Sequence, residues 1–395
     1  MTSGHRFASR SSIGPKVVIA LATAVALGGI FAAPERTWLN LLLDGFYLTS
    51  LAVSALFFLA SQRLSGARWS AGLRRIPEAL MFVLPVGAAL MLAVFFGREA
   101  IYTWSRPDAF AHESPLAGKV DYLQAPFVLL RLLVALSLWG IFAWLFRKTS
   151  LEQDENRNLG IPHHRRLNRY AALFLLVFAP SFTVGSYDWI MSLEPGWFST
   201  MFAVYVFAGT FVQGIAAVTL AVVVLRKRGI LGDSVSELQL HDLGKLLFAF
   251  STFWAYIWTC QYLLIWYGNI PEEAAYYVKR TNGAWLFVFA LNFVINWVTP
   301  FVLLLSVRSK RNGGILQLVS AALLFGHWLD LYLLIMPARW DDPNIGFIEM
   351  SLAAGAAMAA YLVFTRALAR APIVPVNDPI LLADSMHASG GAHAA

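Results

Sequence analysis

His327 and Asp330 are the two residues of this sequence whose types and spacing best suit chemistry. They stand three positions apart within the apolar stretch 315–336, and this spacing places two side chains one turn apart on the same helix face. An imidazole beside a carboxyl group can relay protons, because small changes in its surroundings move its titration through neutral pH. The alternative is a hydrogen-bonded pair that holds its helix against a neighbour and has no part in transport.

A stripe of polar side chains is predicted along the stretch 243–268. Lys245, Thr252, Tyr256 and Thr259 follow each other at steps of seven, four and three residues, so a helix carries them on one face. Such a stripe could line a hydrated path from the cytoplasmic face toward the middle of the membrane. In the alternative interpretation Lys245 extends to the lipid headgroups, and the hydroxyl groups bond back to their own helix.

The connection 186–198 is acidic and aromatic and contains no base. Its aromatic residues are typical of the outer interface of a membrane. Asp188 and Glu194 either mark the exit of a proton path or accept hydrogen bonds from a partner protein, and the sequence leaves both alternatives open. Arg131, within the stretch 124–146, either extends outward or neutralises an acid such as Asp188.

Four further polar side chains in apolar stretches are better explained without chemistry. Asn292 and Asn296 share a helix face at i and i+4, and they predict hydrogen bonds between helices, as does Gln213 in the stretch 198–225. Glu349 stands at the outer end of the stretch 346–369, where we expect it to be solvated.

The elements that must position these residues are helices that cross a membrane. Apolar residues form 58% of the 395 residues and charged residues only 13%, which is too little charge to cover a soluble surface. A helix needs roughly 20 apolar residues to cross the hydrocarbon. The sequence therefore predicts an all-α integral membrane protein with about ten transmembrane helices. The expected spans lie near 17–32, 41–61, 77–97, 124–146, 170–190, 198–225, 243–268, 284–307, 315–336 and 346–369.

Positive charge gathers in every second connection. Lys and Arg are abundant in 1–16, 62–76, 147–169, 226–242 and 308–314, and scarce in the opposite connections. The positive-inside rule then places both termini in the cytoplasm. This distribution explains the net charge of +7 by the orientation of the chain in a membrane. We therefore expect lipid to be a partner of the chain, and no nucleic acid. We expect a cytoplasmic N-terminus (1–16), one polytopic membrane domain (17–370) and an extended cytoplasmic tail (371–395) that is weakly ordered unless bound.

The sequence lacks the ligands of the common redox cofactors of membranes. A b-type haem between helices usually needs two histidines at membrane depth, and an iron–sulfur cluster usually needs four ligands. Only His327 lies deep in an expected span, and Cys260 is the single cysteine. No Gly-rich phosphate loop precedes a helix. We therefore expect this chain to hold no metal, haem or iron–sulfur cluster of its own.

Four segments resemble a known respiratory family. They are 186–195 (SYDWIMSLEP), 241–250 (HDLGKLLFAF), 261–273 (QYLLIWYGNIPEE) and 326–332 (GHWLDLY). They are similar to the second polysulfide-reductase-like (NrfD-type) membrane subunit of bacterial alternative complex III (ActF type). The resemblance is specific through the last six expected spans, whereas the first four match mainly in hydropathy and number.

The resemblance implies a multi-pass protein of the bacterial cytoplasmic (inner) membrane, with eight of its ten helices in two four-helix bundles. It implies a subunit of a respiratory quinol:cytochrome c, or other quinol:acceptor, oxidoreductase. Its partners would be a paralogous quinol-binding membrane subunit and periplasmic subunits with haem c and iron–sulfur clusters. Carried over to this sequence, His327, Asp330, Lys245 and Asp188 become candidates for a proton path. Whether the chain itself contacts quinone or quinol stays open.

Two other functions fit the same residues. A stand-alone proton-coupled secondary transporter would use His327 and Asp330 as its coupling site. Pro85, Pro180 and Pro300 lie within or near expected spans and give this alternative weak support, because transporters often contain broken helices. A purely structural scaffold would use its polar residues only to hold helices together.

Overall fold

A computed structural model describes residues 13–106, 117–156 and 160–381. Throughout these residues the regular structure is helical, which confirms the all-α prediction. Residues 1–12 of the expected N-terminus, 107–116 of the outer connection 98–123, 157–159, and 382–395 of the expected tail lie outside the described part.

Nine helices of the described residues are long and apolar enough to cross a membrane, as in a multi-pass membrane protein. They are α2 (Ile13–Ala32), α3 (Pro34–Leu64), the pair α4 (Arg75–Leu80) and α5 (Leu84–Phe96), α7 (Ala125–Glu155), α8 (Gly160–Trp189), α9 (Phe202–Lys227), the pair α12 (Trp285–Phe293) and α13 (Thr299–Leu303), α15 (Gly313–Ile335) and α16 (Phe347–Ala369).

One of the ten expected spans, 243–268, is helical but is not among these nine. It belongs to α10 (Glu237–Gly268), a helix of 32 residues that packs along α9. Trp254, Trp258, Gln261 and Tyr262 interrupt its aliphatic sequence, which lowers its hydropathy. Two shorter helices, α11 (Pro271–Thr281) and α14 (Val307–Arg311), contact α10.

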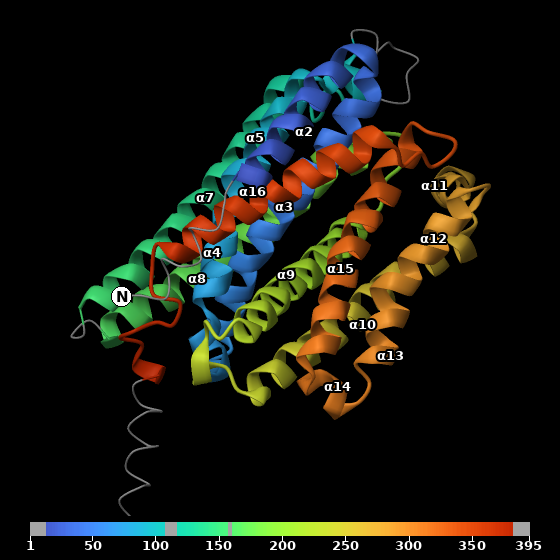
Figure 1. The fold of residues 1–395 in the computed structure, drawn as a ribbon. Coiled ribbons are helices and arrows are strands. Elements are labelled where there is room, and N and C mark those ends of the chain that lie inside the picture. Colours follow the sequence, from blue (N-terminus) through green and yellow to red (C-terminus); the bar gives the residue numbers. More distant parts are fainter. Residues whose placement is uncertain (1–12, 107–116, 157–159, 382–395) are drawn as a thin grey trace, which may run out of the picture.

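The helices form two groups that meet along α3 and α9 (Figure 1). One group contains α2, α3, α5, α7, α8 and α16. The other contains α9, α10, α12, α13 and α15. Of the membrane-crossing stretch of α3, 89% is buried inside the protein, against only 11% of α2, which packs on α16. The most enclosed surfaces of the molecule therefore lie where α3, α9 and α15 face one another.

Small residues allow these helices to approach closely. Gly355 of α16 faces Ala22 of α2 so tightly that a Cβ atom on Gly355 would lie 2.3 Å from the Ala22 Cβ. Gly214 of α9 meets Ser54 of α3 in the same way, at 2.3 Å from the Ser54 Oγ. Close approach at small residues is how membrane helices gain packing energy without a hydrophobic drive between them.

Two of the membrane helices are interrupted. A 3-10 turn, Met81–Val83, separates α4 from α5 shortly before Pro85. A π-helical turn, Val294–Val298, separates α12 from α13 just before Pro300. Proline cannot donate the helical hydrogen bond and clashes with the preceding turn, and π-helical turns are frequent at functional sites.

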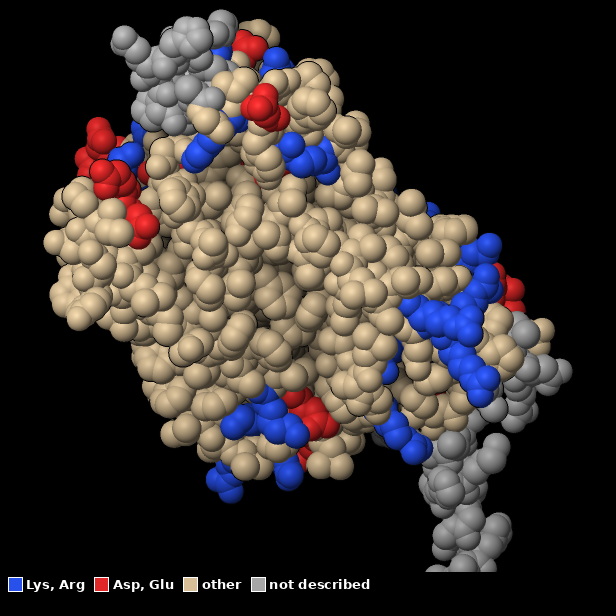
Figure 2. All heavy atoms as spheres, turned by 180° about the vertical axis from the view of Figure 1, so that it is seen from behind, with Lys and Arg blue, Asp and Glu red and all other residues tan. Residues whose placement is uncertain are grey.

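On the face shown in Figure 2, the charged side chains at the surface lie toward the two ends of the molecule. The middle of the face shown is a broad band without Lys, Arg, Asp or Glu. Lys and Arg predominate at the lower end of this view, with a few acidic residues among them, whereas acidic and basic residues mix at the upper end. We call the first the basic end and the second the acidic end, where residues 188–197 lie.

Candidate functional site

Asp330 is the centre of a buried cluster that joins four helices. It lies on α15 and is 1% exposed. Its Oδ1 accepts hydrogen bonds from the hydroxyl of Tyr205 on α9 and from Nδ2 of Asn292 on α12 at 2.8 Å. Its Oδ2 accepts from Nε1 of Trp254 on α10 at 3.1 Å. All three donors are neutral, so within the described chain this carboxyl group is held in place without a hydrogen-bonded cation.

Two asparagines extend the Asp330 cluster into the π-helical turn. Nδ2 of Asn296 donates to Oδ1 of Asn292 at 2.7 Å and to the carbonyl oxygen of Gly326 on α15 at 3.0 Å. Gly326 permits this approach, because a Cβ atom there would lie 2.5 Å from Oδ1 of Asn296. The predicted hydrogen bonds between helices are therefore confirmed, and Asn292 also contacts the candidate chemical group directly.

His327 is buried beside Asp330 but lacks a hydrogen bond of its own. It is 2% exposed, and neither ring nitrogen has a partner among the described residues. Gly209 of α9 makes room for both side chains: a Cβ atom there would lie 2.8 Å from Nδ1 of His327 and 3.2 Å from Oδ2 of Asp330. The predicted placement on one helix face is confirmed, but no hydrogen bond joins the two residues.

Asp44 is a buried carboxyl group that the sequence analysis missed. It is 3% exposed on α3, and its Oδ1 accepts a hydrogen bond from Nε1 of Trp328 at 3.2 Å. Trp328 follows His327 in the chain, so Asp44 belongs to the same region between α3 and α15. The available signal was an acid in an apolar stretch. The helix begins at Pro34, seven residues before the expected span, which places Asp44 about 15 Å along it.

The predicted stripe on α10 does not reach the Asp330 cluster. Lys245 is 56% exposed and pairs with Asp242 at 2.6 Å, Thr252 bonds back to the carbonyl oxygen of Phe248 at 2.9 Å, and Tyr256 is 62% exposed. Thr259 is half-buried on the same side of the helix.

The residue of α10 that contacts Asp330 is Trp254. It is two positions from both Thr252 and Tyr256, and residues two apart point to different sides of a helix. The face of α10 turned toward the cluster is thus the one that the stripe leaves out.

Arg131 neutralises Asp188 at the acidic end, which was one of the two predicted alternatives. Nε of Arg131 on α7 lies 2.5 Å from Oδ2 of Asp188 on α8, whose side chain is 0% exposed. The Arg131 guanidinium also donates to the carbonyl oxygen of Tyr122 at 2.8 Å and lies 4.2 Å from the centre of its ring. Burial, together with the charge of Asp188, raises the pKa of Tyr122 above its ordinary value.

Glu194 is paired with Arg280 of α11. Nη2 of Arg280 donates to Oε1 of Glu194 at 2.6 Å and to the carbonyl oxygen of Leu334 at 3.0 Å, and its guanidinium lies 3.3 Å from the centre of the Tyr276 ring. Arg280 is 2% exposed. The pair ties the 191–197 connection and α11 to the end of α15, a few residues beyond Asp330.

Tyr276 of α11 is a buried tyrosine near Glu194 and Arg280. Burial raises its pKa above the ordinary value; the charge of Arg280 opposes this effect, and those of Glu194 and Asp330 add to it. Its ring stacks on Trp197 at 3.8 Å, and its hydroxyl has no hydrogen-bond partner among the described residues. Tyr276 was not predicted, because its location depends on how α11 folds against α15.

Gln213 and Glu349 had opposite outcomes. Gln213 holds α9 to α3 as predicted: its Nε2 donates to the carbonyl oxygen of Tyr47 at 3.0 Å, and its Oε1 accepts from Ser50 at 2.9 Å. The expectation that Glu349 is solvated was wrong. It is 0% exposed and forms a double hydrogen bond with Arg36 at 2.7 and 2.6 Å, because α3 begins before the expected span and brings Arg36 alongside α16.

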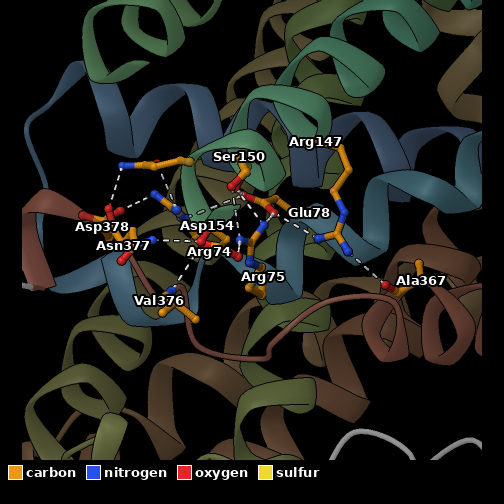
Figure 3. A network of polar contacts seen from close by, with 11 residues as sticks. Arg74, Arg75, Glu78, Arg147, Ser150, Asp154, Ala367, Val376, Asn377 and Asp378 are labelled. Atoms are coloured by element: carbon orange, nitrogen blue, oxygen red, sulfur yellow. Dashed lines mark hydrogen bonds and ion pairs between the residues drawn. The ribbon is translucent and has the colours of Figure 1, made fainter. Parts of the chain in front are cut away.

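A second buried polar cluster, the Glu78 cluster, lies near the basic end (Figure 3). Glu78 of α4 accepts hydrogen bonds from Arg75 at 2.7 Å, from Arg147 of α7 at 3.0 Å and from Ser150 at 2.5 Å. Arg75 also pairs with Asp154. Here each buried charge has a partner of opposite sign, which is the arrangement expected of a structural ion-pair network.

The start of the expected tail is attached to this second cluster (Figure 3). Asp378 pairs with Arg74 and is 3% exposed. The backbone N–H of Val376 donates to Asp154 at 3.2 Å, and Asn377 donates to the Asp154 carbonyl oxygen at 2.8 Å. Weak order was expected only of an unbound tail, and residues 376–378 are bound to the chain's own helices.

Neither comparison with known proteins nor a search for metal ligands identifies these sites. No protein-family profile matches the sequence, and no curated protein matches it significantly. Among the described residues, no three His, Cys, Asp or Glu side chains converge as a metal site.

Proposed function

We propose that the chain is a proton-conducting membrane subunit of a bacterial respiratory quinol:acceptor oxidoreductase of the alternative complex III type. One observation carries the proton role: a carboxyl group held by three neutral donors lies beside an imidazole without a partner, both buried. Buried polar groups that serve only packing are nearly always hydrogen-bonded. Quinol oxidation, haem c and iron–sulfur clusters are assigned to partner subunits.

The proposed path leaves the Asp330 cluster toward the acidic end through tyrosines. Tyr205 donates its hydroxyl to Asp330, and it is the first group of the proposed path. The unpartnered hydroxyl of Tyr276 is the next group, and Glu194 accepts the proton beyond it. Each of these side chains can both donate and accept a hydrogen bond when neutral, which a proton relay requires.

Toward the basic end the proposed path follows hydroxyl groups between α3, α9 and α15. Ser320 lies seven residues before His327, on the same face of α15, and its Oγ is buried without a partner among the described residues. Thr210, next to Gly209, is in the same condition. These groups support a route on the inner faces of the helices, in place of the stripe from Lys245 to Thr259.

The proposal includes an orientation. The basic end faces the cytoplasm by the positive-inside rule, and the acidic end faces the periplasm and its redox partners. Both chain termini are then cytoplasmic, with eight of the helices in two four-helix bundles. The two groups of helices in Figure 1 support this division.

Purification tests the identity. The tagged chain, gently solubilised from its native membrane, is expected to co-purify with subunits that show c-type haem absorbance and iron–sulfur electron paramagnetic resonance signals. A preparation of the solubilised chain that is free of both, with the chain itself intact and monodisperse, would reject the assignment to this complex.

The interrupted helices favour a second candidate, a stand-alone proton-coupled transporter. Breaks such as the π-helical turn 294–298 and the 3-10 turn 81–83 are common at transporter binding sites, and the former carries Asn296 next to the Asp330 cluster. Purified chain reconstituted alone into liposomes with a pH gradient would then accumulate a substrate, and this accumulation would stop in the Asp330→Asn variant.

A further inference from the structure

A cavity opens beside the Glu78 cluster, at the basic end of the molecule. Its volume is about 530 Å³, within the range of small-molecule sites. Its walls come from the end of α3, from the 3-10 segment Arg68–Leu73, from the start of α8 and from residues 378–380, which follow α16. Three parts of the chain that are distant in sequence therefore enclose one space.

Positive charge exceeds negative charge in the cavity wall. Arg63, Arg68 and Arg74 line it, and Asp378 is the only acid among the described lining residues. Asp378 is already paired with Arg74, whereas no ion pair joins Arg63 to another described residue. The charge of Arg74 repels Arg63, and those of Asp378 and Glu78 attract it. An anion would relieve this repulsion, and guanidinium groups bind phosphate oxygens with particular strength.

The cavity also contains a buried polar atom that needs a partner. Asn168 of α8 lines the wall, and its Oδ1 is buried with no hydrogen-bond partner among the described residues. An amide oxygen accepts a hydrogen bond from a hydroxyl group. The ligand that satisfies this wall therefore combines a phosphate group with a hydroxyl donor.

The remaining wall is apolar. Phe58 and Leu59 of α3 line the inner part, and Leu64, at the end of the same membrane helix, is 45% exposed. A basic pocket between helices at the charged end of a membrane protein is a typical headgroup site for anionic lipids.

We propose that this cavity binds the headgroup of an anionic glycerophospholipid, with the phosphate on Arg63 and Arg74 and a glycerol hydroxyl on Asn168. The role is independent of the proton path, because none of these residues belongs to the Asp330 cluster. It would fix the segment 376–380 over the end of α3 and join the two through one lipid.

The test compares lipids on the full-length chain, purified in detergent and stripped of lipid. Phosphatidylglycerol is added, with phosphatidylcholine as the lipid that has the same phosphodiester but no hydroxyl donor and no net charge. Binding is followed by native mass spectrometry and by the shift in thermal unfolding. We expect phosphatidylglycerol to be retained about tenfold more tightly, because only this lipid donates a hydroxyl hydrogen bond to Asn168 and only phosphatidylcholine brings a cation close to the arginines.

Matched variants locate the site. Arg63→Gln and Asn168→Leu are expected to remove this preference for phosphatidylglycerol. Arg308→Gln removes an exposed charge near the same end but outside the cavity, and should retain the preference. Each variant is first shown to be monodisperse with unchanged helix content.

Three results would overturn the proposal. They are equal retention of the two lipids, an equal effect of Arg63→Gln and Arg308→Gln, and binding of soluble glycerol phosphate as tight as that of the lipid. The last would assign the cavity to a free phosphate ester instead.

Discussion

The buried acidic residues of this protein are of two kinds. In the Glu78 cluster and in the Arg131–Asp188 pair, acids meet bases directly. Asp330 and Asp44 instead meet only neutral donors. A carboxylate in a membrane interior costs several kcal/mol unless it is paired, protonated or hydrated. Asp330 and Asp44 have no paired cation among the described residues, so within the membrane interior they have room to exchange a proton.

Asp330→Asn is expected to stop proton conduction and to leave the fold nearly intact. An amide has similar size, and its oxygen can still accept from Tyr205 and Asn292. Its nitrogen cannot accept from Trp254, and the group cannot carry the proton. Loss of a relay group of this kind lowers the rate of proton transfer by about 100-fold or more. Proteoliposomes of the intact complex would be assayed for proton release and for electron transfer in parallel.

The control for this substitution is Asp341→Asn, which changes an exposed acid at the acidic end and should behave as the unmodified protein. If Asp330→Asn releases protons at the normal rate, the cluster serves only to hold helices together.

Arg131→Gln is expected to destabilise the protein, because it leaves Asp188 buried without its cation. Removing one member of a buried pair costs about 3–5 kcal/mol. Since the Arg131 side chain is 25% exposed, about 2 kcal/mol in the free energy of unfolding is a better expectation. The double variant Arg131→Gln, Asp188→Asn should recover most of this loss, as measured by thermal unfolding in detergent. A double variant less stable than the single one would speak against a charge effect.

Whether a contact could be predicted from the sequence depended on whether it lies within one helix or joins two. The shared face of His327 and Asp330 follows from helix geometry within one element. The Arg131–Asp188 pair was one of two predicted alternatives, because the two charges are complementary at similar depth. Trp254 and Tyr276 were out of reach, since an aromatic residue gives no sign of its partner. The Arg36–Glu349 pair was missed because α3 begins before its most apolar stretch.

At the scale of the elements, glycine residues leave room for polar side chains of the neighbouring helix. Gly209 of α9 is the residue against which His327 and Asp330 rest, and Gly326 admits Asn296. That these helices exist was easier to predict than their contacts, because a long apolar stretch needs no partner to become helical in lipid.

Gly209→Ala is expected to displace His327 and to lower stability. The added Cβ atom would lie 2.8 Å from Nδ1 and 3.0 Å from Cε1 of the ring, and overpacking of this kind costs about 1–3 kcal/mol. Gly140→Ala is the matched control, since a Cβ atom there meets nothing within 4 Å and alanine is the better helix former. Thermal unfolding of both variants measures the difference, and equal unfolding temperatures would refute the close contact.

Glu78→Gln is expected to loosen the junction between α4, α7 and the segment after α16. Three arginines surround Glu78, so its loss leaves them to repel each other, at a cost of about 3 kcal/mol. Limited proteolysis beyond residue 371 should become faster, because Asp378 is bound to one of these arginines. Glu152→Gln, at a side chain that is 34% exposed, should leave the cleavage rate unchanged.

At the scale of the whole molecule, the two ends differ in charge. On the face shown in Figure 2, a band without charged side chains separates them. Arginines fasten helices at both ends. At the acidic end Arg280 holds the end of α15, and Arg36 and Arg131 pair with acids of α16 and α8. At the basic end Arg75 and Arg147 hold α4 to α7, so the first group of helices is fastened at both faces of the expected membrane.

The orientation can be checked with single cysteines. Cys260 is the one native cysteine, so Cys260→Ala gives a clean background. In that background Asp341→Cys is expected to react with a membrane-impermeant maleimide added to intact cells, and Arg311→Cys only after the membrane is opened. The opposite pattern would invert the topology, and labelling of both from outside would show that 311 and 341 lie on one side.

The pairing of α2 with α16 also has a consequence for how the chain is made. The ribosome delivers α2 more than 300 residues before α16, yet α16 is the helix on which α2 packs, through Gly355 and Ala22. During that interval α2 has only lipid, or an insertion chaperone, on the surface that α16 later covers. The contact between α2 and α16 can therefore form only when synthesis of the chain is nearly complete. A nascent chain that stops before Phe347 would present an unsealed helix and an unpaired Arg36 to membrane quality control.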